Sequence, residues 1–346
     1  MMYSFRNDYS EGAYPEILKR LSQENKKHRI GYGEDEICKT AKESIRRKLK
    51  CDNCDIHFLV GGTQTNLTII SSALRPFEAV IAVDSGHINV HETGAIEATG
   101  HKVIAVEGKD GKITPEGVQK AVNIHMDEHM VKPGMVYISN ATEIGTIYTK
   151  EELKELRKVC DANGLYLFMD GARLGAALTS EENDLTFEDL CSYCDVFYIG
   201  GTKNGALFGE AVVIVSDKLK PDFRYMIKQK GGMLAKGWLL GIQFEELMKD
   251  NVYLDLAAHA NVLAQKMQDN LEKLGVPFFI KTSTNQIFPI FSNKILSKIN
   301  GIIDYQIWEP YDKAHTVVRF VTSWATEEDD VNETIKLLKE LIESHE

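Results

Sequence analysis

The sequence predicts an α/β fold in which a mainly parallel sheet of seven strands carries helices on both faces, followed by a small C-terminal α+β domain. Between residues 55 and 215, short apolar runs alternate with amphipathic stretches of helical periodicity. The runs are apolar at consecutive positions, which is typical of strands buried on both faces. After about residue 245 this alternation stops. The change of pattern predicts a second domain with a different architecture.

Seven segments have the composition of buried strands. They cover residues 56–60, 79–83, 102–106, 135–139, 165–170, 196–200 and 211–215. The clearest helix between them lies over residues 149–164, because Thr149 is a favourable N-cap residue and Gly164 a favourable C-cap residue. Strands that alternate with helices in this way predict parallel pairing with helical crossovers.

The C-terminal region is expected to form its own small unit. A long helical pattern covers residues 254–275, strand-like pieces cover 285–291 and 316–324, and a final helix covers 326–345. We therefore expect three regions, namely an N-terminal arm (1–25), a large domain (26–245) and a small domain (246–346).

Composition and charge exclude several classes of protein. The 346 residues are 43% hydrophobic and 26% charged, which is ordinary for a folded chain. A formal net charge of −11 argues against nucleic acid or an anionic membrane as the main partner. No apolar run approaches the ~20 residues of a membrane span, and the first residues lack a signal-peptide pattern. We expect a soluble, cytoplasmic protein.

The cysteines are expected to be free thiols and not metal ligands. Two C-x-x-C pairs occur, Cys51/Cys54 and Cys191/Cys194. Paired zinc knuckles typically lie ~15–20 residues apart, and these two pairs are much farther apart in the sequence. A shared metal site would require the fold to bring them together, so no metal is predicted.

Polar and glycine-rich segments follow several of the expected strands, at the sheet edge where α/β proteins bind ligands. They are "GGTQTN" (61–66), "DSGHINVHETGA" (84–95), "DGAR" (170–173) and "GGTKNG" (200–205). The first offers backbone N–H groups and a helix N-terminus for a phosphate, although an ordinary turn into a helix has the same composition. Lys203 in the last segment is a phosphate ligand, a nucleophilic amine or a solvated loop lysine.

An acid and a lysine at strand ends beside a phosphate-sized turn match the needs of pyridoxal 5'-phosphate. This cofactor requires a lysine amine, an anion that keeps its pyridine nitrogen protonated, and a phosphate cradle. Asp170 follows an apolar strand, and a buried carboxylate needs a cationic partner such as the pyridinium. The alternative for Asp170 is a helix N-cap. A phosphate-binding module without catalysis would not explain Asp170 and Lys203 together.

With these motifs the chain resembles the low-specificity threonine aldolases, in the β-eliminating-lyase group of fold-type I pyridoxal-phosphate enzymes. The resemblance runs from "FRNDYSEG" to "VRFVTSWAT", and its most specific parts are "DGAR" before "GGTK", "GHINVHETGA" and "RFVTSW". Three positions depart from the family: Asn7 and Tyr9 replace the serine and threonine of its amino-terminal Ser-Asp-Thr, and Ser323 stands where many members have a histidine.

The resemblance implies roles for individual residues. It implies Lys203 as the Schiff-base lysine, Asp170 as the partner of the pyridine nitrogen, and His87 as the histidine stacked on the ring. It further implies Gly62, Thr63 and Gln64 in the phosphate turn, with Lys228 or Lys236 as a possible further phosphate contact, and Arg173 beside the cofactor and the substrate. For the substrate it implies Asn7, Tyr32, Arg173 and Arg319, with Glu92 as a further pocket residue and His129 as a second histidine near the β-hydroxyl.

The activity implied by the resemblance is cleavage of L-threonine or L-allo-threonine to glycine and an aldehyde. The proton acceptor for the β-hydroxyl is left open between His129, His87 and a water molecule held by one of them. The alternative is β-elimination on another amino acid with the same cofactor residues. The resemblance also implies a homo-oligomer, a dimer or a homotetramer formed as a dimer of dimers, with the active site at the subunit interface.

Overall fold

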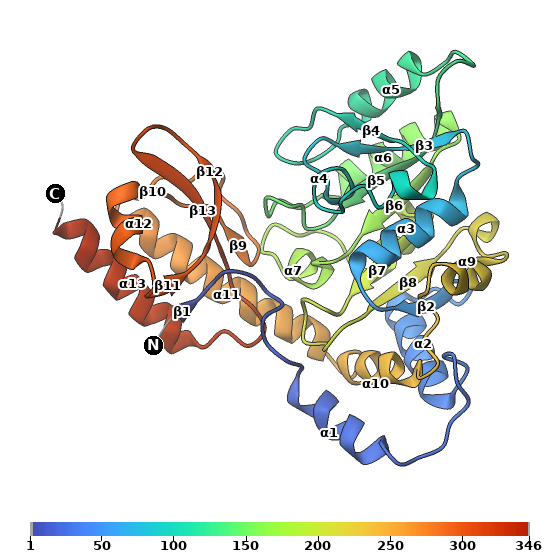
Figure 1. Cartoon of the computed structure of the whole chain (residues 1–346), viewed down its shortest axis with the longest axis horizontal. Helices are drawn as coiled ribbons and strands as arrows, with labels where there is room; N and C mark the ends of the chain where they lie inside the picture. The colour runs from blue at the N-terminus through green and yellow to red at the C-terminus, as the bar shows by residue number, and fades with distance from the viewer. Residues whose placement is uncertain (1–2, 345–346) are drawn as a thin grey trace.

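The central element of the fold is a seven-stranded sheet, shown in a computed structural model that describes residues 3–344 (Figure 1). Its strands are β2 (Asp55–Leu59), β3 (Glu78–Val83), β4 (Val103–Val106), β5 (Lys132–Ser139), β6 (Tyr166–Asp170), β7 (Val196–Gly200) and β8 (Glu210–Ile214). Their order across the sheet is β2-β8-β7-β6-β5-β3-β4. Strand β8 runs antiparallel to both of its neighbours, and the other neighbouring pairs are parallel. The prediction of a mainly parallel, seven-stranded sheet is confirmed.

The sheet is buried on both faces, which explains its uninterrupted apolar runs. Along β3, Ile81 packs into one hydrophobic cluster, whereas its neighbours Val80 and Ala82 pack into another on the opposite side. The covering helices are α2 (Glu36–Leu49), α3 (Gly62–Ala73), α4 (His87–Val90), α5 (Pro115–Ile124), α6 (Lys150–Asn163), α7 (Leu174–Leu178), α8 (Phe187–Tyr193), α9 (Phe223–Gln229) and α10 (Trp238–Leu247).

Helix α6 has the ends that its sequence predicts. The Thr149 hydroxyl accepts a hydrogen bond from the Glu152 backbone N–H, and the Glu152 carboxylate accepts one from the Thr149 N–H. At the other end Gly164 has a φ of 64°, a conformation that glycine adopts without steric strain. Because both signals are local in sequence, the helix limits are readable without the tertiary structure.

The C-terminal part forms a smaller unit with its own core. Helix α11 (Val252–Lys273) leads into a sheet of β10 (Ile290–Ser292), β13 (His315–Val321) and β12 (Gln306–Pro310), with β9 (Gln286–Ile287) also paired to β13. Helices α12 (Asn293–Ile299) and α13 (Glu328–Glu343) complete it. Met267, Phe291 and Phe320 are fully buried there. The small α+β domain is therefore confirmed, while its boundary at residue 246 stays a prediction.

The N-terminal segment is tied to this smaller unit (Figure 1). Strand β1 (Tyr3–Ser4) pairs in parallel with β11 (Ile303–Asp304), and Phe5 is fully buried with its ring 6.0 Å from that of Phe320. Helix α1 (Pro15–Glu24) then continues toward α10. The pairing partner lies about 300 residues away in sequence, so the polar composition of the segment gave no sign of it.

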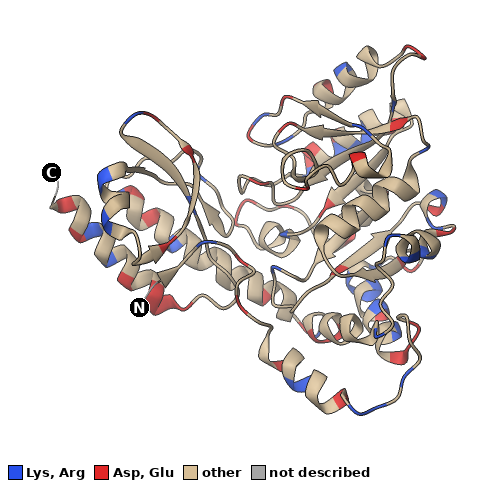
Figure 2. Ribbon diagram, viewed as in Figure 1, with Lys and Arg blue, Asp and Glu red and all other residues tan. Residues whose placement is uncertain are grey.

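Charged residues are interspersed over the helices and loops of both parts, whereas the central strands carry them only at their ends (Figure 2). The few acids at the strand ends are exceptions that require hydrogen-bond or charge partners. No helix among residues 3–344 is long and apolar enough to cross a membrane.

The fold brings the two C-x-x-C pairs close together, although they are distant in sequence. Cys191 lies beside Cys51 and Cys54, and burial followed by these neighbours raises the pKa of its thiol. All six cysteines are free, as expected. Within residues 3–344, no group of three or more His, Cys, Asp or Glu side chains has an arrangement suited to a metal ion.

Candidate active site

A cavity of about 370 Å³ lies at the carboxyl edge of the central sheet, between the ends of β5, β6 and β7 and the beginnings of α3 and α4. Ligand pockets of enzymes commonly have this size and this place in α/β folds. Six of the residues expected in the site line it, namely Gly62, Thr63, His87, Asp170, Arg173 and Lys203. These residues come from separate segments of the chain, so the fold assembles them.

Asp170 lies at the end of β6 and is almost completely buried. Four groups donate hydrogen bonds to its carboxylate, namely the Tyr137 hydroxyl (2.6 Å), the Asn66 amide (3.0 Å), the Ala172 backbone N–H (3.0 Å) and the Tyr198 hydroxyl. Burial alone would favour the neutral acid, but the nearby His87 and these donors outweigh it, so the pKa of Asp170 lies below its ordinary value. Asp170 is therefore a fixed negative charge.

His87 is connected to Asp170 through a chain of hydrogen bonds. Its Nδ1 lies 2.8 Å from Oε1 of Glu92, and the same oxygen accepts a bond of 2.7 Å from the Asn66 amide that also reaches Asp170. Burial lowers the pKa of His87, but the Glu92 hydrogen bond and the Asp170 charge raise it by more. The pKa of His87 therefore lies above its ordinary value. The imidazole is thus held in place and favoured as a cation.

Lys203 lies in the tight turn that follows β7. The turn packs so closely that a Cβ on Gly200 would come within 2.5 Å of the Ala172 carbonyl oxygen, which explains the glycine at this position. Burial, and then the positive charge of Arg173, lower the pKa of Lys203. A lowered pKa makes the neutral, nucleophilic amine more accessible.

Glu210, the first residue of β8, holds this turn from the neighbouring strand. Its Oε1 accepts a hydrogen bond of 2.7 Å from the Thr202 hydroxyl, and its Oε2 accepts one of 3.1 Å from the Gly201 N–H. Burial raises the pKa of Glu210 to about 7. No local pattern indicated this residue, because its position opposite Gly200 depends on strand pairing.

The beginning of α3 offers unpaired backbone N–H groups to the cavity. Gly61 is the N-cap residue and provides no side-chain cap, so the first N–H groups of the helix lack intrahelical partners. A Cβ on Gly61 would meet no atom within 4 Å, so open space adjoins this backbone. Free N–H groups at a helix N-terminus favour a phosphate.

A second cavity of about 260 Å³ adjoins the first and shares Tyr9, His87, His91, Glu143, Arg173 and Lys203 with it. It adds residues of the small domain, namely Gln306, Trp308 and Arg319. The two cavities therefore meet around Lys203, and the second extends the site toward the smaller sheet.

Two arginines line the second cavity, and they differ in their hydrogen-bond partners. Arg173 donates to both carboxylate oxygens of Asp8, at 2.7 and 3.0 Å. Arg319 donates to the amide oxygens of Gln286 (3.0 Å) and Gln306, and in residues 3–344 it has no carboxylate within ion-pair distance. Burial, followed by the charge of Arg173, lowers the pKa of Arg319 to about 10, which leaves it cationic near neutral pH. Arg319 is thus a cation able to receive a ligand carboxylate.

Besides Glu92, which contacts His87 from outside the cavities, four expected site residues line neither cavity of this chain. Gln64 turns away, donating to the Lys230 carbonyl at 3.4 Å and accepting from the Val60 N–H at 3.4 Å. Asn7 closes a local turn by accepting from the Tyr9 N–H and the Ser10 hydroxyl, and its neighbour Asp8 reaches Arg173 instead.

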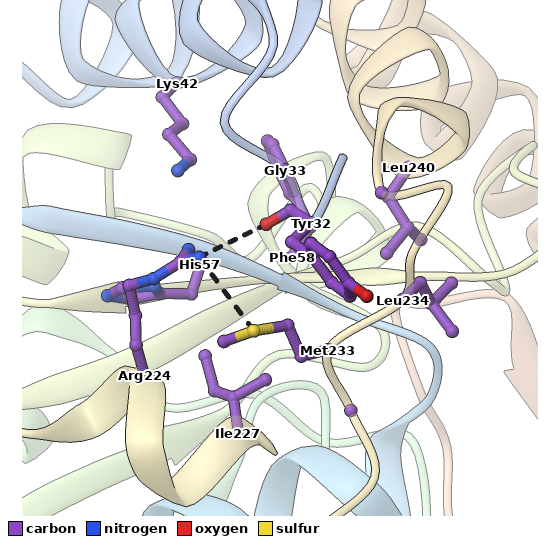
Figure 3. A pocket seen from close by; sticks show the side chains of 12 residues that line it. Tyr32, Gly33, Lys42, His57, Phe58, Arg224, Ile227, Met233, Leu234 and Leu240 are labelled. Atoms are coloured by element: carbon purple, nitrogen blue, oxygen red, sulfur yellow. Dashed lines mark hydrogen bonds between the residues drawn. The ribbon is translucent and has the colours of Figure 1, made fainter. Parts of the chain in front are cut away.

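Tyr32 and His129 are the other two. Tyr32 lies in a separate small pocket with Lys42, His57 and Arg224 (Figure 3), and its side chain is 47% exposed. His129 is exposed in the loop before β5. It precedes the first residue of this strand, whereas Ser139, which lines the cavity, is the last residue of the strand. An eight-residue strand spans roughly 25 Å, so His129 is far from the cavity. Lys228 and Lys236 line neither cavity either, and Lys228 lies 4.9 Å from the Tyr32 ring.

Several site residues were not found from the sequence. Tyr137 and Tyr198 have the appearance of ordinary aromatic residues of buried strands, and only the pairing of β5, β6 and β7 brings their hydroxyls to Asp170. Asn66 and Glu143 are polar positions within apolar surroundings, which is a weak signal of buried hydrogen bonding. His91, for which no role was expected from the sequence, lines both cavities, and burial lowers its pKa.

Comparison with known proteins first identifies the class. Residues 5–294 match the model of the β-eliminating lyase family, and the chain belongs to this family. The structure of an aspartate aminotransferase from Thermus thermophilus superposes with a TM-score of 0.72 at 14% identity, over 98% of this chain and 91% of that one. At that level of identity the likeness concerns the fold alone.

Particular members of the family are more similar. The low specificity L-threonine aldolase of Pseudomonas sp. is 32% identical over 336 residues, which cover 95% of both chains. The structure of the Leishmania major threonine aldolase matches with a TM-score of 0.97 and 48% identity, over 98% of this chain and 99% of that chain. The family and fold inferred from the motifs are confirmed.

Proposed function

We propose that this protein is a pyridoxal-phosphate-dependent aldehyde-lyase that cleaves L-threonine and L-allo-threonine to glycine and acetaldehyde. The observation that carries the proposal is the meeting of Lys203 and Asp170 in one cavity, beside the free helix N-terminus of α3. Family membership and the similar threonine aldolases support the same activity. β-Elimination on another amino acid is the alternative, since it would use the same cofactor residues.

The residues present fit the cofactor. Lys203 would hold it covalently through its amine, the N–H groups at Gly62 and Thr63 would hold its phosphate, and Asp170 would keep its pyridine nitrogen protonated. When bound, the cofactor supplies an acceptor for the electron pair released at the substrate Cα. His87 would cover the ring, since Glu92 fixes the orientation of its imidazole.

The second cavity would hold the amino acid. Arg319 has no carboxylate partner among the described residues and would bind the substrate carboxylate, a task suited to its planar guanidinium. Arg173, oriented by two hydrogen bonds from its guanidinium to Asp8, lines the same cavity and would support it. These two cations would together fix the carboxylate of the substrate.

The site is proposed to be completed by a second copy of the chain, in a dimer or a dimer of dimers. The support is that Tyr32 and His129, which the family resemblance placed in the pocket, lie outside it and are exposed in a single chain. Sedimentation of an active enzyme as a monomer would reject this. A cytoplasmic location is proposed on the absence of a membrane-spanning helix in residues 3–344.

The product assay tests the function directly. Incubation with L-threonine and pyridoxal phosphate should give equimolar glycine and acetaldehyde. Pyruvate or another keto acid with ammonia, from any of a panel of amino acids, would instead support the β-elimination alternative. Borohydride treatment followed by peptide mass spectrometry should place the cofactor on Lys203.

A further inference from the structure

Glu143 is a buried carboxylate in the wall shared by the two cavities. Its Oε1 accepts two hydrogen bonds, one of 3.0 Å from the backbone N–H of His87 and one of 2.7 Å from the Ser139 hydroxyl. Its Oε2 is also buried and has no hydrogen-bond partner within residues 3–344. The carboxylate is thus held firmly by one oxygen and left bare at the other.

A bare buried acceptor is unfavourable and marks a position that receives a donor from elsewhere. The other two carboxylates that line the first cavity differ from Glu143, because both oxygens of Asp170 and of Glu210 accept hydrogen bonds. Glu92 also has a bare Oε2, but it lines neither cavity. Glu143 alone among these acids combines a free oxygen with a place in the ligand cavity.

We propose that Oε2 of Glu143 accepts the β-hydroxyl proton of the substrate during cleavage, an inference that rests on the aldolase function proposed above. The substrate O–H bond breaks and its proton moves to Glu143. The electron pair of that bond becomes the second C–O bond of the aldehyde as Cα–Cβ breaks. The bound cofactor would supply the acceptor for the Cα–Cβ electron pair, and glycine forms once Cα takes up a proton from water.

The environment of Glu143 suits a proton acceptor. Burial raises its pKa above that of an ordinary carboxyl group. The hydrogen bond from Ser139 and the charge of His87 lower this pKa, whereas the charge of Asp170 raises it. Arg173, Tyr137 and Tyr148 are the other charged or titratable groups that interact with it. A raised pKa makes the ionised form a stronger base, closer to the optimum for catalysis near neutral pH.

The histidines that line the site are less suited. His87 donates or shares its Nδ1 proton with Glu92 and is favoured as a cation, which cannot accept a proton. His91 is exposed, and its lowered pKa leaves it neutral, so it is the competing acceptor. The variant His91→Asn should therefore be compared with Glu143→Gln.

The test separates cleavage from the other chemistry of the site. Glu143→Gln keeps the shape and an oxygen for the His87 and Ser139 donors but removes the base. We expect kcat for L-threonine cleavage to fall by ~100-fold or more, the usual contribution of a positioned base. Exchange of the glycine α-hydrogen in D₂O needs no β-hydroxyl base and should stay within about threefold of wild type. The dissociation constant of pyridoxal phosphate from the apoprotein, measured by equilibrium dialysis, should also be unchanged.

Matched variants make the outcome decisive. Glu246→Gln alters another buried glutamate, which lies on α10 and accepts a hydrogen bond of 2.6 Å from Lys249. This variant should resemble wild type in all three measurements. Normal cleavage by Glu143→Gln, or a ~100-fold loss confined to His91→Asn, would overturn the proposal. Equal losses of cleavage, exchange and cofactor affinity in Glu143→Gln would assign Glu143 a structural role and overturn it as well. If wild type itself forms no acetaldehyde from threonine, the proposed function fails instead.

Discussion

Two buried carboxylates line the same cavity near the ends of β6 and β5, and they differ in how many hydrogen bonds they accept. Asp170, at the end of β6, accepts from four donors, whereas Glu143, four residues beyond the end of β5, accepts from two through one oxygen only. Burial disfavours the charge of both. The pKa of Asp170 is nevertheless lowered and that of Glu143 raised.

The difference shows that the charge of His87 and the hydrogen-bond donors, and not burial, keep Asp170 ionised. Asp170 is a permanent charge, as a partner of a pyridinium must be. Glu143 is a group whose protonation can change during a reaction. The two carboxylates therefore serve separate tasks, and variants of each can be used to test that separation.

The largest effect is expected from Lys203, because both carboxylates act on chemistry that requires the cofactor. Lys203→Ala should reduce kcat for threonine cleavage by ~10³-fold or more, as loss of a covalent catalytic group does. Borohydride treatment should then leave no cofactor on the peptide that contains residue 203. Near-normal turnover in this variant would remove the basis of the comparison.

Asp170→Asn is expected to have the next largest effect. The neutral amide no longer favours a protonated pyridine nitrogen, and we expect kcat to fall by about 10²–10³-fold, within the range of a lost catalytic charge. In this variant the NH₂ group also faces donor groups from which the carboxylate accepted hydrogen bonds. The loss of these hydrogen bonds should lower the free energy of unfolding by about 1–3 kcal/mol. Thermal denaturation and steady-state kinetics measure the two effects. A folded variant with normal kcat would contradict the role of a fixed charge.

Removal of single hydrogen-bond donors should raise the pKa of Asp170, in the direction of the raised pKa of Glu143. Tyr137→Phe and Tyr198→Phe each take away one hydrogen bond and should raise the pKa of Asp170, so that kcat declines at a higher pH on the acid side. At neutral pH we expect a loss of about three- to tenfold, corresponding to roughly 1 kcal/mol. The pH profile of kcat is the measurement, and an unshifted acid limb in the double variant would count against the argument.

The last effect concerns Glu210, and it is one of stability and not of catalysis. Its folded pKa of about 7 lies above the unfolded value, so its ionisation opposes folding, and stability is lost as the pH rises through this interval. Relative to Glu210→Gln, the apoprotein should lose on the order of 3 kcal/mol of unfolding free energy between pH 4 and pH 8. Urea denaturation at several pH values measures this difference. A constant difference between the two proteins would show that the carboxyl group is not destabilised.

The comparison also explains which parts of the site the sequence could predict. Lys203 and Asp170 were found because a strand followed by a polar or glycine-rich turn is a local pattern. The donors that give Asp170 its charge come from β5, β7 and α3, and only strand pairing brings them together. Glu143 lies in a loop where nothing in the sequence indicates a free oxygen.

The same distinction applies to the fold. The ends of α6 follow from Thr149 and Gly164, which act within one turn of the helix. The pairing of β1 with β11 and the approach of Cys51 to Cys191 join segments that are far apart, so no local pattern could indicate them. For the same reason, whether Tyr32 and His129 reach the site depends on a second chain and stays a prediction.

The separate tasks of Asp170 and Glu143 can be tested most directly by measuring two reactions in the same preparations of Asp170→Asn and Glu143→Gln. One is cleavage of L-threonine, and the other is exchange of the glycine α-hydrogen in D₂O. Both reactions need the ring charge that Asp170 maintains, but only cleavage needs a base for the β-hydroxyl. We predict that Asp170→Asn loses both reactions and that Glu143→Gln loses cleavage alone. Equal losses of both reactions in both variants, or full cleavage by Glu143→Gln, would contradict the account.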